Sequence, residues 1–295
     1  MEIVPVSLHN CADYTGYARR YGPEHDESFL PEASFTPDED YPAALLQAHG
    51  AVIGAVGLMR TPHFRNKSKA RLTILHTVEG TLEAYALLLE AILPYTGDLR
   101  SIYGFLPETQ TTTRRHWEAL GFTVERFVYL LAYHAQETRP AELPPGYDLL
   151  ALTPADTAEI EQLCELWNQN YRQQLGFIGA TPEFIQEAFL SAENIPGGIL
   201  LLRHGSEAVA TIKVNRDNEP GSQAAEIGMV SVAPAYRGRG LGRLMLRRAL
   251  EVALRHNLSP VYLSVNAENR SAVALYLSEG FTEEKGMVCY TKNLP

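Results

Sequence analysis

The sequence has few cysteines, no long apolar run and no excess of positive charge. Cys11, Cys164 and Cys289 lie far apart and form no Cys-x-x-Cys or Cys/His pattern, which argues against a disulfide framework and a metal site. The 35 acidic residues outnumber the 25 basic ones, giving a net charge of -10, so nucleic acid is not an expected partner. No apolar stretch approaches the ~20 residues that cross a bilayer, so no membrane partner is expected either.

The first residues, MEIVPVSLHN, lack the basic and apolar regions of a signal peptide. A cytoplasmic location is therefore expected by default, with the thiols reduced. At 295 residues, the chain has the length of about two domains.

Four pairs of similar segments occur in the same order in the two halves of the chain, which indicates a duplicated domain. The pairs are 2–8 with 148–154, 36–46 with 181–190, 48–60 with 203–216, and 116–125 with 275–284. Between the halves, ETRPAELPPGY at 137–147 is rich in proline and glycine, which break regular structure. We therefore expect domains at 1–138 and 146–295.

Each half alternates short apolar segments with helical patterns, which predicts two mixed α/β domains. In the second half, Thr153 and Thr181, each followed by proline, are expected to cap helices. The second half also contains a βαβ unit with parallel strands. It consists of a strand, a glycine-rich turn, a helix from Gly240 to about His256 and a further strand.

The turn of this unit, Arg237-Gly238-Arg239-Gly240-Leu241-Gly242, has the features of an anion site. The first turn of a helix leaves about four N–H groups without partners, and glycines let an anion approach them. No Lys-Ser/Thr follows, as a P-loop requires, and Arg243 replaces the last glycine of the dinucleotide fingerprint.

Two segments resemble motifs of the GNAT superfamily of N-acetyltransferases. VAPAYRGRGLGRLML is similar to the acyl-CoA pyrophosphate motif Gln/Arg-x-x-Gly-x-Gly/Ala, and NAENRSAVALYLSEGF at 266–281 is similar to a second element that contains Asn, Ala, Tyr and Gly-Phe. The resemblance covers the second half well and the first half weakly. It implies mixed, centrally parted sheets flanked by helices, with the pantetheine of acetyl-CoA between the parted strands and no metal.

The resemblance also implies roles for individual residues. Those expected to bind the coenzyme are Val230, Val232, Arg237, Gly238, Arg239, Gly240, Leu241, Gly242, Arg243 and Asn269. Val230 and Val232 flank the backbone N–H expected to polarise the thioester carbonyl. Tyr276 is the candidate general acid for the leaving thiolate, because a phenol is protonated at neutral pH. The alternative for Tyr276 is a tyrosine that only packs in the core, and the alternative for Asn269 is a helix cap.

The general base and the acceptor contacts are less well defined by the sequence. Glu226 is the candidate base, with a surface carboxylate as the alternative. Other family members carry a glutamate twelve residues before the tyrosine, where this chain has Ser264. The candidate acceptor contacts, with ordinary helix surface as the alternative, are Asn168, Tyr171, Arg172 and Phe177.

The first half departs from the family pattern. Its matching turn has one glycine, Gly80, and no arginine, while Glu79 would repel phosphate and Trp117 replaces the tyrosine. We expect this copy to be non-catalytic and to bury an interface or shape the acceptor pocket.

The expected function is transfer of an acetyl group from acetyl-CoA to a primary amine of a small molecule or peptide, by direct attack in a ternary complex. The alternatives are a coenzyme-A-binding pseudoenzyme or regulatory scaffold and a nucleotide-phosphate binder. The sequence leaves the acceptor and the oligomeric state open, and the internal duplication is compatible with a monomer.

Overall fold

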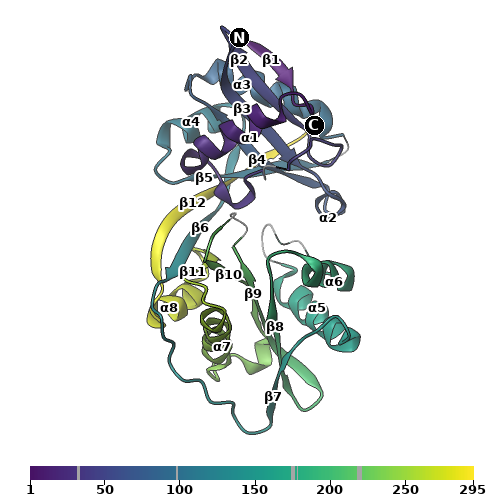
Figure 1. The fold of residues 1–295 in the computed structure, drawn as a ribbon, viewed down its shortest axis with the longest axis vertical. Helices are drawn as coiled ribbons and strands as arrows, with labels where there is room; N and C mark the ends of the chain where they lie inside the picture. Colours follow the sequence, from purple (N-terminus) through teal and green to yellow (C-terminus); the bar gives the residue numbers. More distant parts are fainter. Residues whose placement is uncertain (32–33, 98, 174–176, 178, 218–220) are drawn as a thin grey trace. The chain divides into compact units, whose positions relative to one another are not determined.

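The chain forms two compact units in a computed structural model that describes all residues except 32–33, 98, 174–176, 178 and 218–220 (Figure 1). The first unit comprises Met1–Val128 and Lys285–Pro295, and the second comprises Tyr129–Glu284. This division differs from the boundaries expected at 1–138 and 146–295, because the last strand of the chain pairs within the first unit.

Apart from α2 (Pro62–Arg65) in the first half and α6 (Pro182–Leu190) in the second, both halves of the chain run through the same order of helices and strands. In the first half these are β1 (Glu2–Pro5), α1 (Cys11–Arg20), β2 (Ala43–Ala48), β3 (Ala51–Met59), β4 (Lys69–Thr77), α3 (Leu82–Ile92), β5 (Ser101–Pro107), α4 (Thr111–Ala119) and β6 (Thr123–Tyr133), with the short α2 (Pro62–Arg65) after β3. In the second half they are β7 (Tyr147–Ala151), α5 (Thr157–Tyr171), α6 (Pro182–Leu190), β8 (Asn194–His204), β9 (Glu207–Arg216), β10 (Ala225–Val232), α7 (Leu241–Arg255), β11 (Val261–Asn266), α8 (Arg270–Ser278) and β12 (Thr282–Asn293). The duplication inferred from the sequence is therefore also present in the order of helices and strands.

Three of the four segment pairs join equivalent elements, and one pair is wrong. Residues 36–46 lead into β2, whereas 181–190 form α6, so these two segments are not equivalent. The match came from a Thr-Pro pair and an apolar run, which suit a strand entry and a helix start alike.

In the first unit the strand order is β1-β2-β3-β4-β5-β12. Alternate side chains of each strand face opposite layers: Leu45 packs with α1, whereas Leu46 packs with α3. The strands β4 and β5 are parallel, and they pair only over Lys69–Arg71 with Ser101–Tyr103, after which they part.

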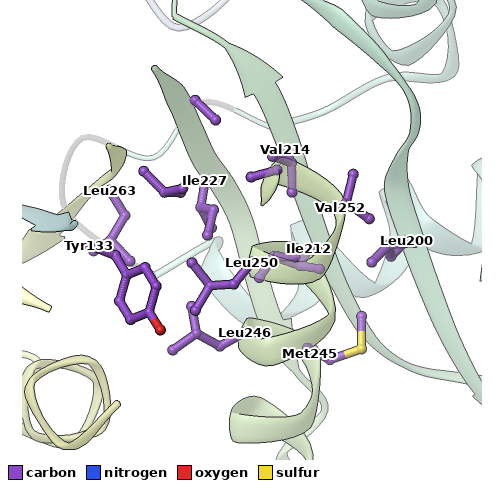
Figure 2. Close-up of a cluster of buried hydrophobic side chains, with 14 of the residues drawn as sticks. Tyr133, Leu200, Ile212, Val214, Ile227, Met245, Leu246, Leu250, Val252 and Leu263 are labelled. Carbon is purple, nitrogen blue, oxygen red and sulfur yellow. The ribbon is translucent and has the colours of Figure 1, made fainter. Parts of the chain in front are cut away.

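In the second unit the order is β6-β11-β10-β9-β8-β7. The helix α7 covers one face through Met245, Leu246 and Leu250 (Figure 2), while α5 and α6 cover the other (Figure 1). The strands β10 and β11 are parallel, as predicted, and pair only over Ala225–Ile227. Both units thus have the centrally parted sheet that the resemblance implied.

Two of the expected helix starts have different outcomes. Thr181 caps α6, because its hydroxyl accepts a hydrogen bond from the Phe184 N–H at 3.2 Å. The expected cap at Thr153 is wrong. Its own N–H donates to the Asp156 carboxylate at 2.7 Å, and this turn delays the start of α5 to Thr157.

Two buried histidines lie between α1 and β4 in the first unit. His25 is 2% exposed and has its ring nitrogens 3.0 Å and 3.1 Å from the carbonyl oxygens of Ala18 and Asp26. The Nδ1 of His76, which is 3% exposed, lies 2.9 Å from the Tyr17 hydroxyl. Burial lowers the pKa of both imidazoles, and the neighbouring His25 lowers that of His76 further.

We therefore expect acid to destabilise the first unit. The folded state favours neutral imidazoles, so below a pH of about 6.5 the unfolded chain binds more protons and the free energy of unfolding falls. Trp117 fluorescence in a Trp167→Phe background reports urea unfolding of this unit. The free energy of unfolding should fall less between pH 7.5 and pH 5 in the His25→Gln/His76→Gln variant than in the parent. An equal fall would show that these two histidines do not cause the acid sensitivity.

Candidate active site

The connection from β10 to α7 forms an exposed corner, residues 237–243, built on two left-handed glycines. Gly238 has a φ of 77° and Gly240 a φ of 79°, and a Cβ at either position would meet nothing within 4 Å. Glycine is therefore required by the backbone conformation rather than by crowding, and space is left above the corner.

The two units differ in what covers the first turn of the equivalent helix. Gly240 is the N-cap of α7 and has no side chain to accept from the first amides of the helix. In the first unit, the Thr81 hydroxyl accepts a hydrogen bond from the Ala84 N–H at 3.3 Å. The amides of α7 therefore remain available for an anion, whereas one amide of α3 is satisfied internally.

The three arginines at the corner each make a different contact. Arg237 Nε donates to the Val232 carbonyl at 3.1 Å, and the Arg239 guanidinium lies 4.8 Å from the centre of the Tyr236 ring. Arg243 Nε lies 2.8 Å from Glu279 Oε1, so its guanidinium is engaged in an ion pair away from the corner glycines. The charge near the corner therefore comes from Arg237 and Arg239.

Glu279, which the sequence analysis did not identify, joins the two helices of the site. This carboxylate is 6% exposed and accepts from Arg247 Nε at 2.7 Å and NH2 at 3.0 Å, in addition to Arg243. Hydrogen bonding from Arg247 holds the pKa of Glu279 below its usual range. The available sequence signal was the spacing of four between Arg243 and Arg247 on one helix face.

Beyond Ile227, β10 has an edge that β11 does not cover, here called the parted edge, residues 228–232. The Ala233 N–H donates to Val209 of β9 at 2.8 Å. Because groups alternate along a strand, the Ser231 N–H also faces β9 and the Val232 N–H faces the parted side. The N–H donor on the parted side, here called the gap, is thus that of Val232. It is not the N–H of Ser231, the residue between the two valines.

Two side chains from α5 hold the parted edge. The Tyr171 hydroxyl donates to the Val230 carbonyl, and the Asn170 amide donates to the Ser231 hydroxyl. They meet a bulge, since the pairing of β10 with β9 shifts register between Gly228 and Ser231 and Met229 has a φ of 51°. The sequence analysis missed Asn170 and Ser231.

Tyr276 lies on α8 and is 5% exposed. Burial raises its pKa, and the nearby Tyr171 phenol raises it further, so the hydroxyl is protonated at physiological pH. Within the part of the chain that the structure describes, this hydroxyl forms no hydrogen bond. Asn269 caps α8 by accepting from the Ala272 N–H at 3.2 Å, which confirms the cap among its two expected roles.

Comparison with known proteins shows which family the second half of the chain resembles. A family model described as the acetyltransferase (GNAT) family matches residues 160–281. The likeness to this family thus extends over residues 160–281, less than half of the chain. A mycothiol acetyltransferase from Corynebacterium glutamicum is 39% identical over 94 residues, which are 32% of this chain and 31% of that protein. The N-alpha-acetyltransferase RimI of Mycobacterium tuberculosis is 38% identical over 79 residues, 27% of this chain and 48% of that protein.

Solved structures extend the likeness over the whole chain. A GCN5-related N-acetyltransferase from Sphaerobacter thermophilus has a TM-score of 0.71 at 16% identity and covers 99% of this chain and 95% of its own. A tandem GNAT protein from the clavulanic acid biosynthesis pathway has a TM-score of 0.67 at 18% identity, with coverage of 99% and 98%. The tandem GNAT fold is thus shared, while the curated relatives match over less than half of their length.

In the GNAT domain, Glu226 lies between Ala225 and Ile227, whose side chains face α7. Its exposed carboxylate therefore projects from the other face of the sheet, the face that α5 covers. Its charge and that of Glu193 oppose the burial that lowers the pKa of Lys213 on the adjacent strand. Glu226 is thus placed on the face of the sheet from which α5 reaches the parted edge.

The candidate acceptor residues of the GNAT domain separate into two groups. Asn168 braces the chain before α6, since its amide donates to the Ala180 carbonyl and accepts from the Ala180 N–H, both at 2.8 Å. Tyr171 and Phe177 pack with Trp167, which the sequence analysis missed, at ring-centre distances of 4.2 Å for Trp167–Tyr171 and 6.0 Å for the other two pairs. Arg172 is exposed at the end of α5.

In the first unit, side chains occupy the region where β4 and β5 part. Trp117 on α4 is 2% exposed, and a Cβ added to Gly104 of β5 would lie 2.8 Å from its ring and 3.1 Å from Leu72 of β4. The indole that replaces the tyrosine therefore packs against both strands. Among the described residues, no cluster of three or more His, Cys, Asp or Glu suits a metal ion, and no helix is long and apolar enough to cross a membrane.

We expect Gly240→Glu to abolish acetyl-CoA binding, because the new carboxylate would lie at the helix N-terminus where an anion should bind. The matched control is Gly80→Glu, at a glycine of the first unit with a φ of 59° and no atom within 4 Å of an added Cβ. Isothermal titration calorimetry should show binding lost in the first variant and retained in the second. Equal affinities in the two variants would refute the corner as the coenzyme site.

Proposed function

We propose that this chain is an acetyl-CoA-dependent N-acetyltransferase that acetylates a primary amine in a ternary complex. The observation that carries the proposal is the combination, in one unit, of an uncapped helix corner, a parted strand edge and a buried phenol that forms no hydrogen bond with any residue the structure describes. The first unit has the same backbone plan, including parted strands, but Thr81 caps its helix and Trp117 packs where the strands part, and we propose that it is non-catalytic.

Each group of the site has a chemical task in this proposal. The corner amides and the guanidinium groups of Arg237 and Arg239 bind the coenzyme pyrophosphate. The Val232 N–H donates to the thioester carbonyl and stabilises the charge that develops there as the amine attacks. Asn269, besides capping α8, has an amide N–H available for the pantetheine arm.

The proton transfers are assigned to two residues. An alkylammonium has a pKa near 10.4 and must lose a proton before attack, and we assign Glu226 to accept it. Tyr276 donates its phenol proton as the carbon–sulfur bond breaks. The raised pKa of Tyr276 makes full transfer to a free thiolate unfavourable, so the donation belongs to the transition state, in which charge builds on sulfur.

The curated relatives guide the choice of acceptors to test. One is named for mycothiol and another for N-alpha-acetylation, so the panel should combine amino sugars, aminoglycosides and polyamines with a peptide that has a free N-terminus. Thiol release from acetyl-CoA measures turnover. Acetyl-CoA binding without turnover on the whole panel would favour the regulatory scaffold instead.

We expect Tyr276→Phe to lower kcat about a hundredfold, in line with the usual contribution of a general acid, while the dissociation constant of acetyl-CoA changes little. The ring is retained, so packing against Phe281 at 5.9 Å is preserved. Steady-state kinetics and calorimetry on the same preparation separate the two effects. An unchanged kcat would remove Tyr276 from the mechanism.

A further inference from the structure

We propose that Tyr171 is a positioning residue of the acyl-transfer site: its hydroxyl neutralises the Val230 carbonyl, so that the parted edge offers the thioester the Val232 N–H and not a free Val230 carbonyl. This inference rests on the proposed function and extends it to a residue expected only to contact the acceptor.

The argument starts from the composition of the parted edge. A strand edge normally presents alternating N–H donors and C=O acceptors. On this edge the Val230 carbonyl accepts from Tyr171 and the Val232 carbonyl accepts from Arg237 Nε at 3.1 Å. Both acceptors are thus satisfied by side chains, while the Val232 N–H is left facing the gap.

The bulge makes this pairing necessary. Met229 is left-handed, with a φ of 51°, and the register shift removes Val230 from the ladder with β9. A carbonyl without a partner beside a bound thioester would repel the oxygen on which negative charge develops. A buried acceptor that is left without a hydrogen-bond donor is unfavourable.

The Tyr171 side chain is held in place for this role. Its ring packs on Trp167 at 4.2 Å and on Phe177 at 6.0 Å, so the hydroxyl direction does not depend on the bond to Val230 alone. Burial raises the pKa of Tyr171, while the charge of Arg237 opposes that rise. Tyr171 also raises the pKa of Tyr276.

The test compares Tyr171→Phe with Tyr133→Phe. Tyr133 also donates its hydroxyl to a backbone carbonyl, that of Glu137, in the same unit but away from the parted edge. Calorimetry measures the affinities for acetyl-CoA and for free coenzyme A, which lacks the thioester carbonyl. Tyr171→Phe should weaken acetyl-CoA binding about tenfold and lower kcat about tenfold, with the affinity for coenzyme A unchanged. Tyr133→Phe should change neither the ratio of the two affinities nor kcat.

Two outcomes would overturn the inference. One is an unchanged ratio of the two affinities, which includes equal weakening of both coenzyme forms. The other is loss of the basic limb of the pH–rate profile in Tyr171→Phe, which would make Tyr171 a proton donor. Failure of the proposed function is recognised separately. In that case the wild-type protein binds acetyl-CoA but acetylates no amine, and the affinity ratio still tests Tyr171. A wild-type protein that binds neither form refutes both.

Discussion

The short pairing of β10 with β11 is the constraint on which the candidate site depends. Three residues of β10 pair with β11, and the strand then continues without it to Val232. An unpaired strand edge inside a sheet must satisfy its backbone groups in another way. Here the side chains of Tyr171 and Arg237 satisfy the carbonyls, and the remaining N–H group gives the gap its preference for an electron-rich ligand.

The two units show how one backbone plan becomes open or closed through a few side chains. Both have parted parallel strands followed by a helix. In the second unit the helix begins after a glycine, and Tyr276 on α8 forms no hydrogen bond within the described part of the chain. In the first unit Thr81 caps the helix and the Trp117 indole packs between the strands. The contrast lies in hydrogen-bond partners and side-chain volume rather than in topology.

The site in the second unit is held together by contacts between elements that are distant in the sequence. Glu279 holds two arginines of α7, which fixes the helix bearing the open corner against the end of the helix bearing Tyr276. On the other side, Asn170 and Tyr171 of α5 hold the bulged strand. A buried carboxylate with two guanidinium partners keeps its charge, so this brace persists across physiological pH.

The sequence alone determined the duplication, the mixed α/β class, the parallel βαβ unit and the glycine corner, because periodicity, glycine placement and helix caps are local properties. It misplaced the start of α5 and one repeat pair, since a Thr-Pro step fits several local structures. Only the tertiary structure decided that Val232 faces the gap, that Glu279 joins α7 to α8 and that Tyr171 bonds to Val230. Those facts depend on strand register and on contacts between distant segments, which no local pattern encodes.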